Sequence, residues 1–382
     1  MKKQKICIIG GSLTGLVTAI CLSKLNCEID LISSNFDQNL KFNGTIAISQ
    51  SNLDFLNQLN ISQSFEKEVW PCSVMKLYGE DNNKKFLKTF ELNRENKNEK
   101  ILYMLENSKI MKLMVKKAKQ IKSISIKNKE KISSISSSAA LRTIKFKNSF
   151  NKYNLIIICT GHNSNLVKNI FKEKVVENSY KELAITTTLS HSPLRNYIVR
   201  QIFLENEIFA LLPISNTKTS IVWTLKKNIS GKNESFLKKK IKFYSKNYIK
   251  NINFLEKIKY KNLNFLIRNK YYKDRILLFG DALHLMHPFV GQGFNMTLRD
   301  LKSLQDILTK KINLGLDIGS SDILSEFSDE VKPRNFAFSL GTDLLKNSIS
   351  SIKLRKDALK ILDKSNLAKN IFFDIANKGL RF

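Results

Sequence analysis

One carboxylate and two glycine-rich segments stand out in this chain because their residue types and spacing could do chemistry. In the longer segment, an apolar run that begins after Arg275 leads directly to Gly280 and Asp281. Such a run is typical of a buried parallel strand, which delivers the residue behind it to the carboxyl edge of its sheet. At that edge the carboxylate of Asp281 could accept hydrogen bonds from the hydroxyl groups of a sugar or a ribitol chain.

The residues that follow have the composition of a ligand-binding turn. Pro288 precedes Gly291, Gln292 and Gly293, and a segment able to form a helix begins at about Asn295. Two glycines that flank one residue let backbone N–H groups approach a flat ligand, and the helix N-terminus behind them favours an anionic flavin or a phosphate. An ordinary strand, a glycine-rich turn and a structural helix would also explain these residues one by one. The candidate contacts of the segment are Asp281, Pro288, Gly291, Gln292, Gly293, Phe294 and Asn295.

The second glycine-rich segment lies near the N-terminus. Residues 5–10 are typical of a short buried strand, and residues 10–15 are typical of a tight turn that opens a helix. A second strand is expected over 28–32, so the segment has the length of one βαβ unit. Its turn would hold a pyrophosphate at the helix N-terminus. The candidate contacts are Gly10, Gly11, Ser12, Leu13, Thr14, Gly15 and, after the second strand, Ser33.

The longer segment also has a recognisable pattern. It reads Gly280-Asp281-Ala282-x-His284-x-x-His287-Pro288-x-x-Gly291-Gln292-Gly293-x-Asn295, followed by Leu298-Arg299-Asp300. This pattern resembles the second FAD-binding motif of the ubiquinone-biosynthesis hydroxylases, which are class A aromatic flavoprotein monooxygenases with the para-hydroxybenzoate hydroxylase fold. The resemblance implies that Asp281 meets the ribitol–pyrophosphate side of FAD, and that the Gly-Gln-Gly turn faces the isoalloxazine ring.

The resemblance also implies an activity. In that family NAD(P)H reduces FAD and dioxygen then supplies the oxygen that hydroxylates an electron-rich ring, so a polyprenylated phenol of ubiquinone biosynthesis is the expected substrate. Residues 102–107, 210–213, 222–224 and 333–344 resemble further parts of the family, so the likeness extends with gaps over nearly the whole chain. No catalytic acid or base can be named from the sequence.

Several residues depart from the family pattern at positions that face the cofactor. Ser12 replaces the middle glycine of the first motif, and Ser33 replaces the acidic residue expected at the adenosine ribose. Gly44 stands where an arginine is common, and Thr160 stands where an aspartate contacts both FAD and NAD(P)H. The alternative function is therefore a catalytically degraded flavoprotein relative that acts as a prenyl-ring-binding or partner-binding accessory protein.

We expect an α/β fold with a Rossmann-like parallel sheet that binds FAD, an inserted and mostly antiparallel substrate sheet, and a helical C-terminal tail. Residues 121–150 are rich in Lys and Ser but alternate around 144–147, which favours a small meander over a linker. The expected FAD-binding domain is discontinuous, over 1–69, 100–175 and 266–345. The substrate domain would cover 70–99 and 176–265, and C-terminal helices would cover 346–382.

The charge of the chain bears on its partners. The 382 residues carry a formal net charge of +31, mostly from Lys residues spread along the whole chain. Nucleic-acid readers usually gather Arg and aromatic residues on a recognisable module, so we expect no nucleic-acid partner. Scattered Lys suits an anionic membrane surface, although a compositional habit would also explain it. The expected partners are a small lipophilic aromatic substrate, such a membrane surface and other enzymes of the ubiquinone pathway.

The remaining composition bears on compartment and metal chemistry. The five cysteines lack C-x-x-C spacing, which is typical of free thiols in a reducing cytosol. No run of eighteen apolar residues is present, and the N-terminus lacks a signal-peptide pattern, so we expect a cytoplasmic protein, peripheral on the inner face of the membrane. His284 and His287 lack further ligands at metal-binding spacing, so no metal is expected.

Overall fold

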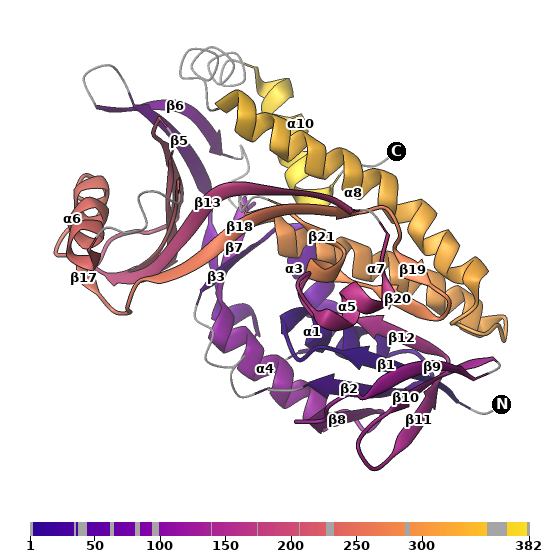
Figure 1. The fold of residues 1–382 in the computed structure, drawn as a ribbon. Coiled ribbons are helices and arrows are strands. Elements are labelled where there is room, and N and C mark those ends of the chain that lie inside the picture. The colour runs from indigo at the N-terminus through magenta and orange to yellow at the C-terminus, as the bar shows by residue number, and fades with distance from the viewer. Residues whose placement is uncertain are drawn as a thin grey trace.

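The computed structural model of the chain shows two large sheets that a small third sheet connects, with helices around them (Figure 1). This arrangement confirms the expected α/β class. The structure describes residues 3–33, 36, 44–61, 65–80, 85–93, 99–138, 140–173, 175–205, 207–226, 233–286, 291–349 and 365–379.

The first sheet has six strands in the order β19-β20-β12-β1-β2-β8. The strands from β20 to β8 run parallel, whereas the edge strand β19 is antiparallel to β20. The chain adds strands on both sides of β1, so the loop after β1 lies at the topological switch point at which such sheets bind ligands. The strands are β1 (Gln4–Ile9), β2 (Cys27–Ser33), β8 (Ile124–Asn128), β12 (Leu155–Ile158), β19 (Tyr272–Lys273) and β20 (Ile276–Leu278).

Helices and a meander bury this sheet. α1 (Leu13–Leu22) is almost wholly buried and packs on β1 and β2, and α4 (Asn107–Gln120) and α7 (Gln292–Asn313) contact it. The expected meander is confirmed, since β9, β10 and β11 form an antiparallel sheet that contacts β12 and β1. The remaining bounds are β9 (Ser134–Ser138), β10 (Leu141–Lys145), β11 (Phe150–Tyr153), α5 (Asn165–Ile170) and α8 (Ser321–Ile349).

The second large sheet has the order β21-β18-β13-β16-β15-β14-β5-β6, with β17 paired to β13. Its pairs are antiparallel except for β14 and β5, which agrees with the mostly antiparallel sheet that the sequence predicts. α6 (Glu234–Ser245) packs on one face, while β13 and β18 extend back toward the first sheet (Figure 1). The strands are β5 (Val74–Glu80), β6 (Phe86–Asn93), β13 (Val175–Ser190), β14 (Ile198–Phe203), β15 (Ile208–Ser215), β16 (Lys218–Lys226), β17 (Asn253–Phe254), β18 (Lys259–Arg268) and β21 (His284–Leu285).

A small antiparallel sheet in the order β3-β7-β4 lies between the two large sheets, and its strands β7 and β4 contact β15. The segment 70–78, at the start of the expected substrate domain, divides at Ser73 between β4 here and β5 in the second sheet. The apolar segment over 153–161 is likewise divided at Asn154, between β11 and β12. The bounds are β3 (Thr45–Ile48), α3 (Gln50–Gln58), η1 (Phe65–Glu68), β4 (Val69–Cys72) and β7 (Leu102–Glu106).

Two further helices follow α7 in the described part of the chain. α8 contains Pro333 and continues to Ile349, and α10 (Asn366–Lys378) packs beside α3, where Ser51 N–H donates to Asn377 Oδ1 at 3.0 Å. The expected domain limits at 345/346 and 265/266 fall inside α8 and β18, so neither coincides with the end of an element. Among the described residues no helix has the length and apolar character needed to span a membrane.

Candidate functional site

The turn between β1 and α1 is as tight as the sequence predicts. Gly10 has φ +131°, and a Cβ at this position would lie 2.8 Å from the carbonyl carbon of Cys159. A Cβ at Gly15 would lie 1.8 Å from the carbonyl oxygen of Gly10, so a side chain fits at neither position. α1 then begins at Leu13, and the side chain of its N-cap residue Ser12 makes no capping hydrogen bond. The first N–H groups of α1 are therefore available to a ligand.

The structure brings Asp281 to this turn. Gly280 has φ +61° in the short helix η3 (Gly280–Ala282), and a Cβ there would lie 2.7 Å from Thr14 Cγ2. The two glycine-rich motifs, far apart in the sequence, are thus in direct contact. Asp281 is exposed and lies at the carboxyl end of β20, as its position after the apolar run predicts.

A cavity of about 360 Å³ lies where these elements meet. Phe294 of α7, Met111 of α4 and Lys261 of β18 contribute to its walls, so three further elements enclose the turn. Five of the cofactor contacts that the sequence predicts lie in the wall of this cavity. The lining residues are Ser12, Leu13, Thr14, Gly44, Thr45, Ile46, Asn107, Met111, Cys159, Gly161, Lys261, Asp281 and Phe294.

The start of α7 separates this cavity from a second one. Gly291 caps α7 with φ +64°, and a Cβ there would lie 2.9 Å from the Cβ of Ala47. α7 starts at Gln292, three residues before the position expected from the sequence. The side chain of Gln292 is 3% exposed, and neither Oε1 nor Nε2 has a hydrogen-bond partner within the described part of the chain. An unpaired buried amide is costly, so Gln292 fits a site that a polar ligand completes.

The side-chain amide of Asn295 forms its hydrogen bonds within the protein. Its Oδ1 accepts from Ser49 N–H at 2.9 Å and from Asn52 Nδ2 at 2.8 Å. Its Nδ2 donates to the carbonyl oxygens of Ala47 at 2.9 Å and Gly291 at 3.2 Å. Three of these bonds fasten the start of α7 to β3 and α3, and the fourth closes its first turn. The structure thus gives Asn295 a positioning role, and its direct contact with a cofactor stays a prediction.

Other residues of the longer motif form a buried polar cluster. His284 Nε2 lies 3.1 Å from Asp300 Oδ2, and Asn335 Nδ2 donates to the same oxygen at 2.9 Å. The three side chains are at most 4% exposed. The cluster ties β21 to α7 and α8 through one ring nitrogen of His284. His287 and Pro288 lie outside the described residues.

The structure also locates residues that depart from the family pattern. Ser33 is 4% exposed at the end of β2, and its Oγ would lie 2.3 Å from a Cβ on Gly11. Thr160 lies at the end of β12, and its Oγ1 is buried without a hydrogen-bond partner among the described residues. Gly44 lines the cavity. The predicted contacts Gly10, Gly11, Gly15 and Gly293 stay predictions.

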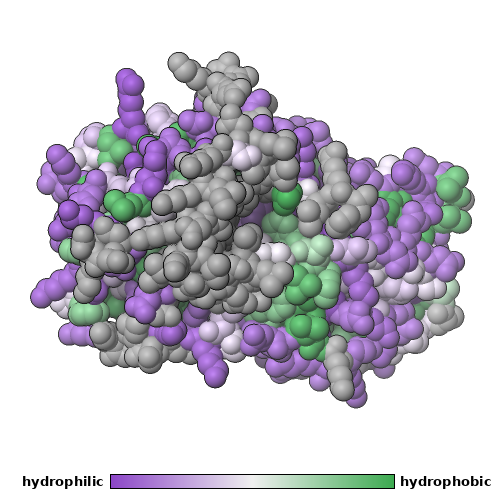
Figure 2. Space-filling view, turned by 90° about the horizontal axis from the view of Figure 1, so that it is seen from above, coloured by the Kyte–Doolittle hydropathy of each residue, from purple (hydrophilic) through white to green (hydrophobic). Residues whose placement is uncertain are grey.

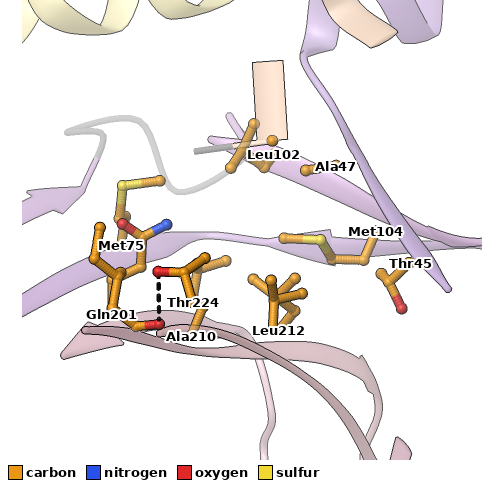
Figure 3. Close-up of a pocket in the computed structure, with 13 residues that line it drawn as sticks. Thr45, Ala47, Met75, Leu102, Met104, Gln201, Ala210, Leu212 and Thr224 are labelled. Atoms are coloured by element: carbon orange, nitrogen blue, oxygen red, sulfur yellow. Dashed lines mark hydrogen bonds between the residues drawn. The ribbon is translucent and has the colours of Figure 1, made fainter. Parts of the chain in front are cut away.

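A second, smaller pocket of about 100 Å³ lies on the other side of the start of α7. Its walls come from residues of β3, β5, β7, β14, β15 and β16 (Figure 3). Thr45 also lines the larger cavity. The lining is apolar apart from a few uncharged groups. The residues are Thr45, Ala47, Met75, Leu102, Met104, Val199, Gln201, Ile208, Ala210, Leu212, Val222, Thr224 and Gly291.

Sequence reasoning missed several residues of the site. Lys261 is one lysine among many, so nothing in the sequence marks it as part of the site. His162 Nε2 lies 3.4 Å from Asn264 Nδ2, and burial lowers the pKa of His162 below its usual value, while Glu177 and Asp281 oppose this shift. Gln201 carried a usable signal, because a polar residue at an inward position of an alternating strand is unusual.

Comparisons with known proteins agree with this geometry. The family model for the FAD binding domain matches residues 3–336. The ubiquinone biosynthesis monooxygenase COQ6 of Dictyostelium discoideum is 22% identical over 447 residues, which cover 97% of this chain and 90% of that protein. The ubiquinone hydroxylase UbiL of Rhodospirillum rubrum is 28% identical over 202 residues, which cover 50% of this chain and 47% of that protein.

Solved structures share the fold. p-Nitrophenol 4-monooxygenase PnpA from Pseudomonas putida superposes with a TM-score of 0.78 at 13% identity, over 100% of this chain and 99% of that chain. HpxO of Klebsiella pneumoniae, complexed with FAD and uric acid, gives a TM-score of 0.76 at 14% identity, over 98% and 96%. The family match, the open N-terminus of α1 and the unpaired amide of Gln292 agree, and the chain belongs to the FAD binding domain family.

Proposed function

We propose that this protein is an FAD-dependent monooxygenase that hydroxylates the ring of a polyprenylated phenol in ubiquinone biosynthesis. The observation that carries the proposal is that the two cavities lie next to each other. The larger cavity, which would hold the cofactor, and the smaller apolar pocket share Thr45 and lie on the two sides of the start of α7. A flat ring at the end of the first cavity would therefore face a second ring held in the pocket.

The residues of the larger cavity suit the parts of FAD. The open N-terminus of α1, between Ser12 and Gly15, would bind the pyrophosphate. Asp281 would accept hydrogen bonds from the ribitol hydroxyls, and the N-terminus of α7 at Gly291 would favour negative charge on the isoalloxazine ring. When bound there, FAD supplies the redox chemistry and the activation of dioxygen.

The protein's own contribution is to hold the substrate ring and to exclude water. Met75, Leu102, Met104 and Leu212 form an apolar wall, in which an uncharged ring loses little on leaving water (Figure 3). A dry site strengthens every hydrogen bond made to the ring and protects reactive species from water. On the face seen from above, hydrophobic side chains gather beside a hollow, which suits a lipophilic substrate (Figure 2).

NAD(P)H is the proposed reductant, in line with the family that the sequence resembles. Thr160 is the residue that weighs against ordinary use of NAD(P)H, because it stands where the family carries an aspartate. The rival function is an accessory protein that binds a prenylated ring, or a partner enzyme, without turnover. The close approach of Gly280, the residue before Asp281, to Thr14 of the β1–α1 turn favours the enzyme.

We also propose that the protein works at an anionic membrane surface on the cytoplasmic side, beside other enzymes of the pathway. The support is a basic face of α6 and the residues after it, here called the α6 stripe. It consists of Lys239, Lys242, Phe243, Lys246 and Lys250, which recur at intervals of three or four residues and are all exposed. Lysines around one exposed aromatic ring suit anionic headgroups.

The visible spectrum of the purified protein tests the function. We expect flavin bands that correspond to about one FAD per chain, and oxidation of NADH or NADPH that speeds up when a prenylated phenol is added. A hydroxylated product detected by mass spectrometry would complete the assignment. A colourless protein that takes up no FAD would support the accessory role instead.

A further inference from the structure

The apolar pocket contains one polar group whose bonding is incomplete. Gln201 is 4% exposed on β14, and its Oε1 is buried without a hydrogen-bond partner among the described residues. Val199, Gln201 and Phe203 alternate with Arg200 and Ile202 along the strand, and the first set faces the small sheet and the pocket. Figure 3 shows the amide of Gln201 beside Met75, directed into the pocket.

Nothing in the local fold requires an amide at this place. The neighbours that line the pocket around Gln201 are Met75, Val199, Ala210 and Val222, and a buried amide oxygen among apolar groups is unfavourable unless a donor reaches it. Two other polar side chains line the pocket, Thr45 and Thr224, and Thr224 directs its hydroxyl to the carbonyl oxygen of Ile208 at 3.5 Å (Figure 3). Gln201 Oε1 is the buried acceptor of this pocket that has no partner among the described residues, so it is open to a ligand.

We propose that Gln201 Oε1 accepts a hydrogen bond from the ring hydroxyl of the substrate and so determines which ring the enzyme takes. The inference rests on the proposed function, because it identifies the substrate group that the same site recognises. The residues that line the pocket are uncharged, so the ligand class is a neutral phenol with an apolar substituent.

This contact would also orient the ring for chemistry. A phenol held by its hydroxyl at Gln201 has the position of that hydroxyl fixed in the pocket, which reduces the number of orientations that the ring can take. An acceptor on the hydroxyl hydrogen raises electron density in the ring, and an electron-rich ring is the kind that this chemistry oxidises. Gln201 is thus a specificity-determining residue that touches the substrate.

The test compares two ligands in two proteins. The ligands are 2-geranylphenol and geranylbenzene, which differ by the hydroxyl alone, and their affinities are measured by calorimetry on the FAD-loaded protein. We expect the wild type to bind the phenol about tenfold more tightly than the hydrocarbon. Gln201→Met keeps the length of the side chain but loses the acceptor, so it should bind both ligands equally.

The controls separate the possible failures. Arg200→Lys changes the same strand on its opposite face and should keep the preference for the phenol. Equal binding of both ligands by the wild type overturns the inference without any variant, even if Gln201→Met fails to fold. A full preference for the phenol in Gln201→Met also overturns it. A protein that holds no FAD but still prefers the phenol would overturn the proposed oxygenation and keep the ring recognition.

Discussion

At the scale of single residues, Asp281 is the point where the two glycine-rich motifs meet. Its backbone is fixed by the contact between Gly280 and Thr14, and its carboxylate is exposed in the cavity. Replacing Asp281 by Ala removes hydrogen bonds to a charged acceptor, each worth about 1.5–3 kcal/mol. We expect FAD affinity to fall roughly tenfold to a hundredfold, measured by quenching of flavin fluorescence. Asp322→Ala, an exposed carboxylate on α8, is the control, and unchanged affinity in the Asp281 variant would refute the assignment.

Ser33 gives a second prediction at this scale. An acidic side chain after β2 would accept hydrogen bonds from the adenosine ribose, whereas Ser33 offers a neutral oxygen. We expect Ser33→Glu to tighten FAD binding by about 1 kcal/mol, measured by titration. Because a Cβ on Gly11 would collide with the side chain at position 33, a double variant that combines Ser33→Glu with Gly11→Ala should lose the gain. Weaker or unchanged binding in the single variant would mean that Ser33 does not lie at the ribose.

At the scale of elements, the sequence predicts those strands and turns that short apolar runs and glycines determine. The unit from β1 to β2 and the strand before Asp281 lie where expected, because each is a buried run that ends in a glycine-rich turn. Other features depend on partners distant in the chain. The pattern of 70–78 cannot tell that Ser73 divides two sheets, and the bonds among His284, Asp300 and Asn335 join residues 16 and 35 positions apart.

Asn295 shows how one element is held for function. Replacing it by Ala removes four hydrogen bonds, three of which fasten the start of α7 to β3 and α3, and it leaves buried groups unpaired. We expect the free energy of unfolding to fall by about 2–4 kcal/mol, measured with urea. FAD affinity should fall as well, since Gly291 and Phe294 move with this helix start. Asn313→Ala, at the exposed far end of α7, should change neither quantity, and a stable Asn295 variant with normal affinity would contradict the positioning role.

At the scale of the whole molecule, buried weak acids make stability depend on alkaline pH. Burial raises the pKa of Cys27 to about 11, of Cys159 to about 12 and of Tyr248 to about 12. The unfolded chain ionises these thiols near pH 8.5 and the phenol near pH 10, so above those values it binds fewer protons than the native state. These groups therefore contribute no pH dependence below about pH 8, and the free energy of unfolding should fall as the pH rises from about 8.5 to 12. Urea unfolding at several pH values under reducing conditions measures this, and a flat profile would contradict it.

The charge of +31 leads to the last prediction, which asks whether one particular lysine-rich surface binds anionic membranes. The α6 stripe places four lysines around Phe243, which is 50% exposed, with Lys246 Nζ 4.5 Å from the ring centroid. Near an anionic surface each lysine contributes about 1 kcal/mol, which salt weakens. We expect co-sedimentation with phosphatidylserine-containing vesicles at low salt, and replacing Lys239, Lys242 and Lys246 by Gln should largely abolish it. The same change at Lys112, Lys116 and Lys119, exposed on α4, removes equal charge from a helix face without an exposed aromatic ring. If both triple variants lose binding equally, total charge governs association, and if the wild type binds neutral vesicles as well, electrostatic docking is wrong.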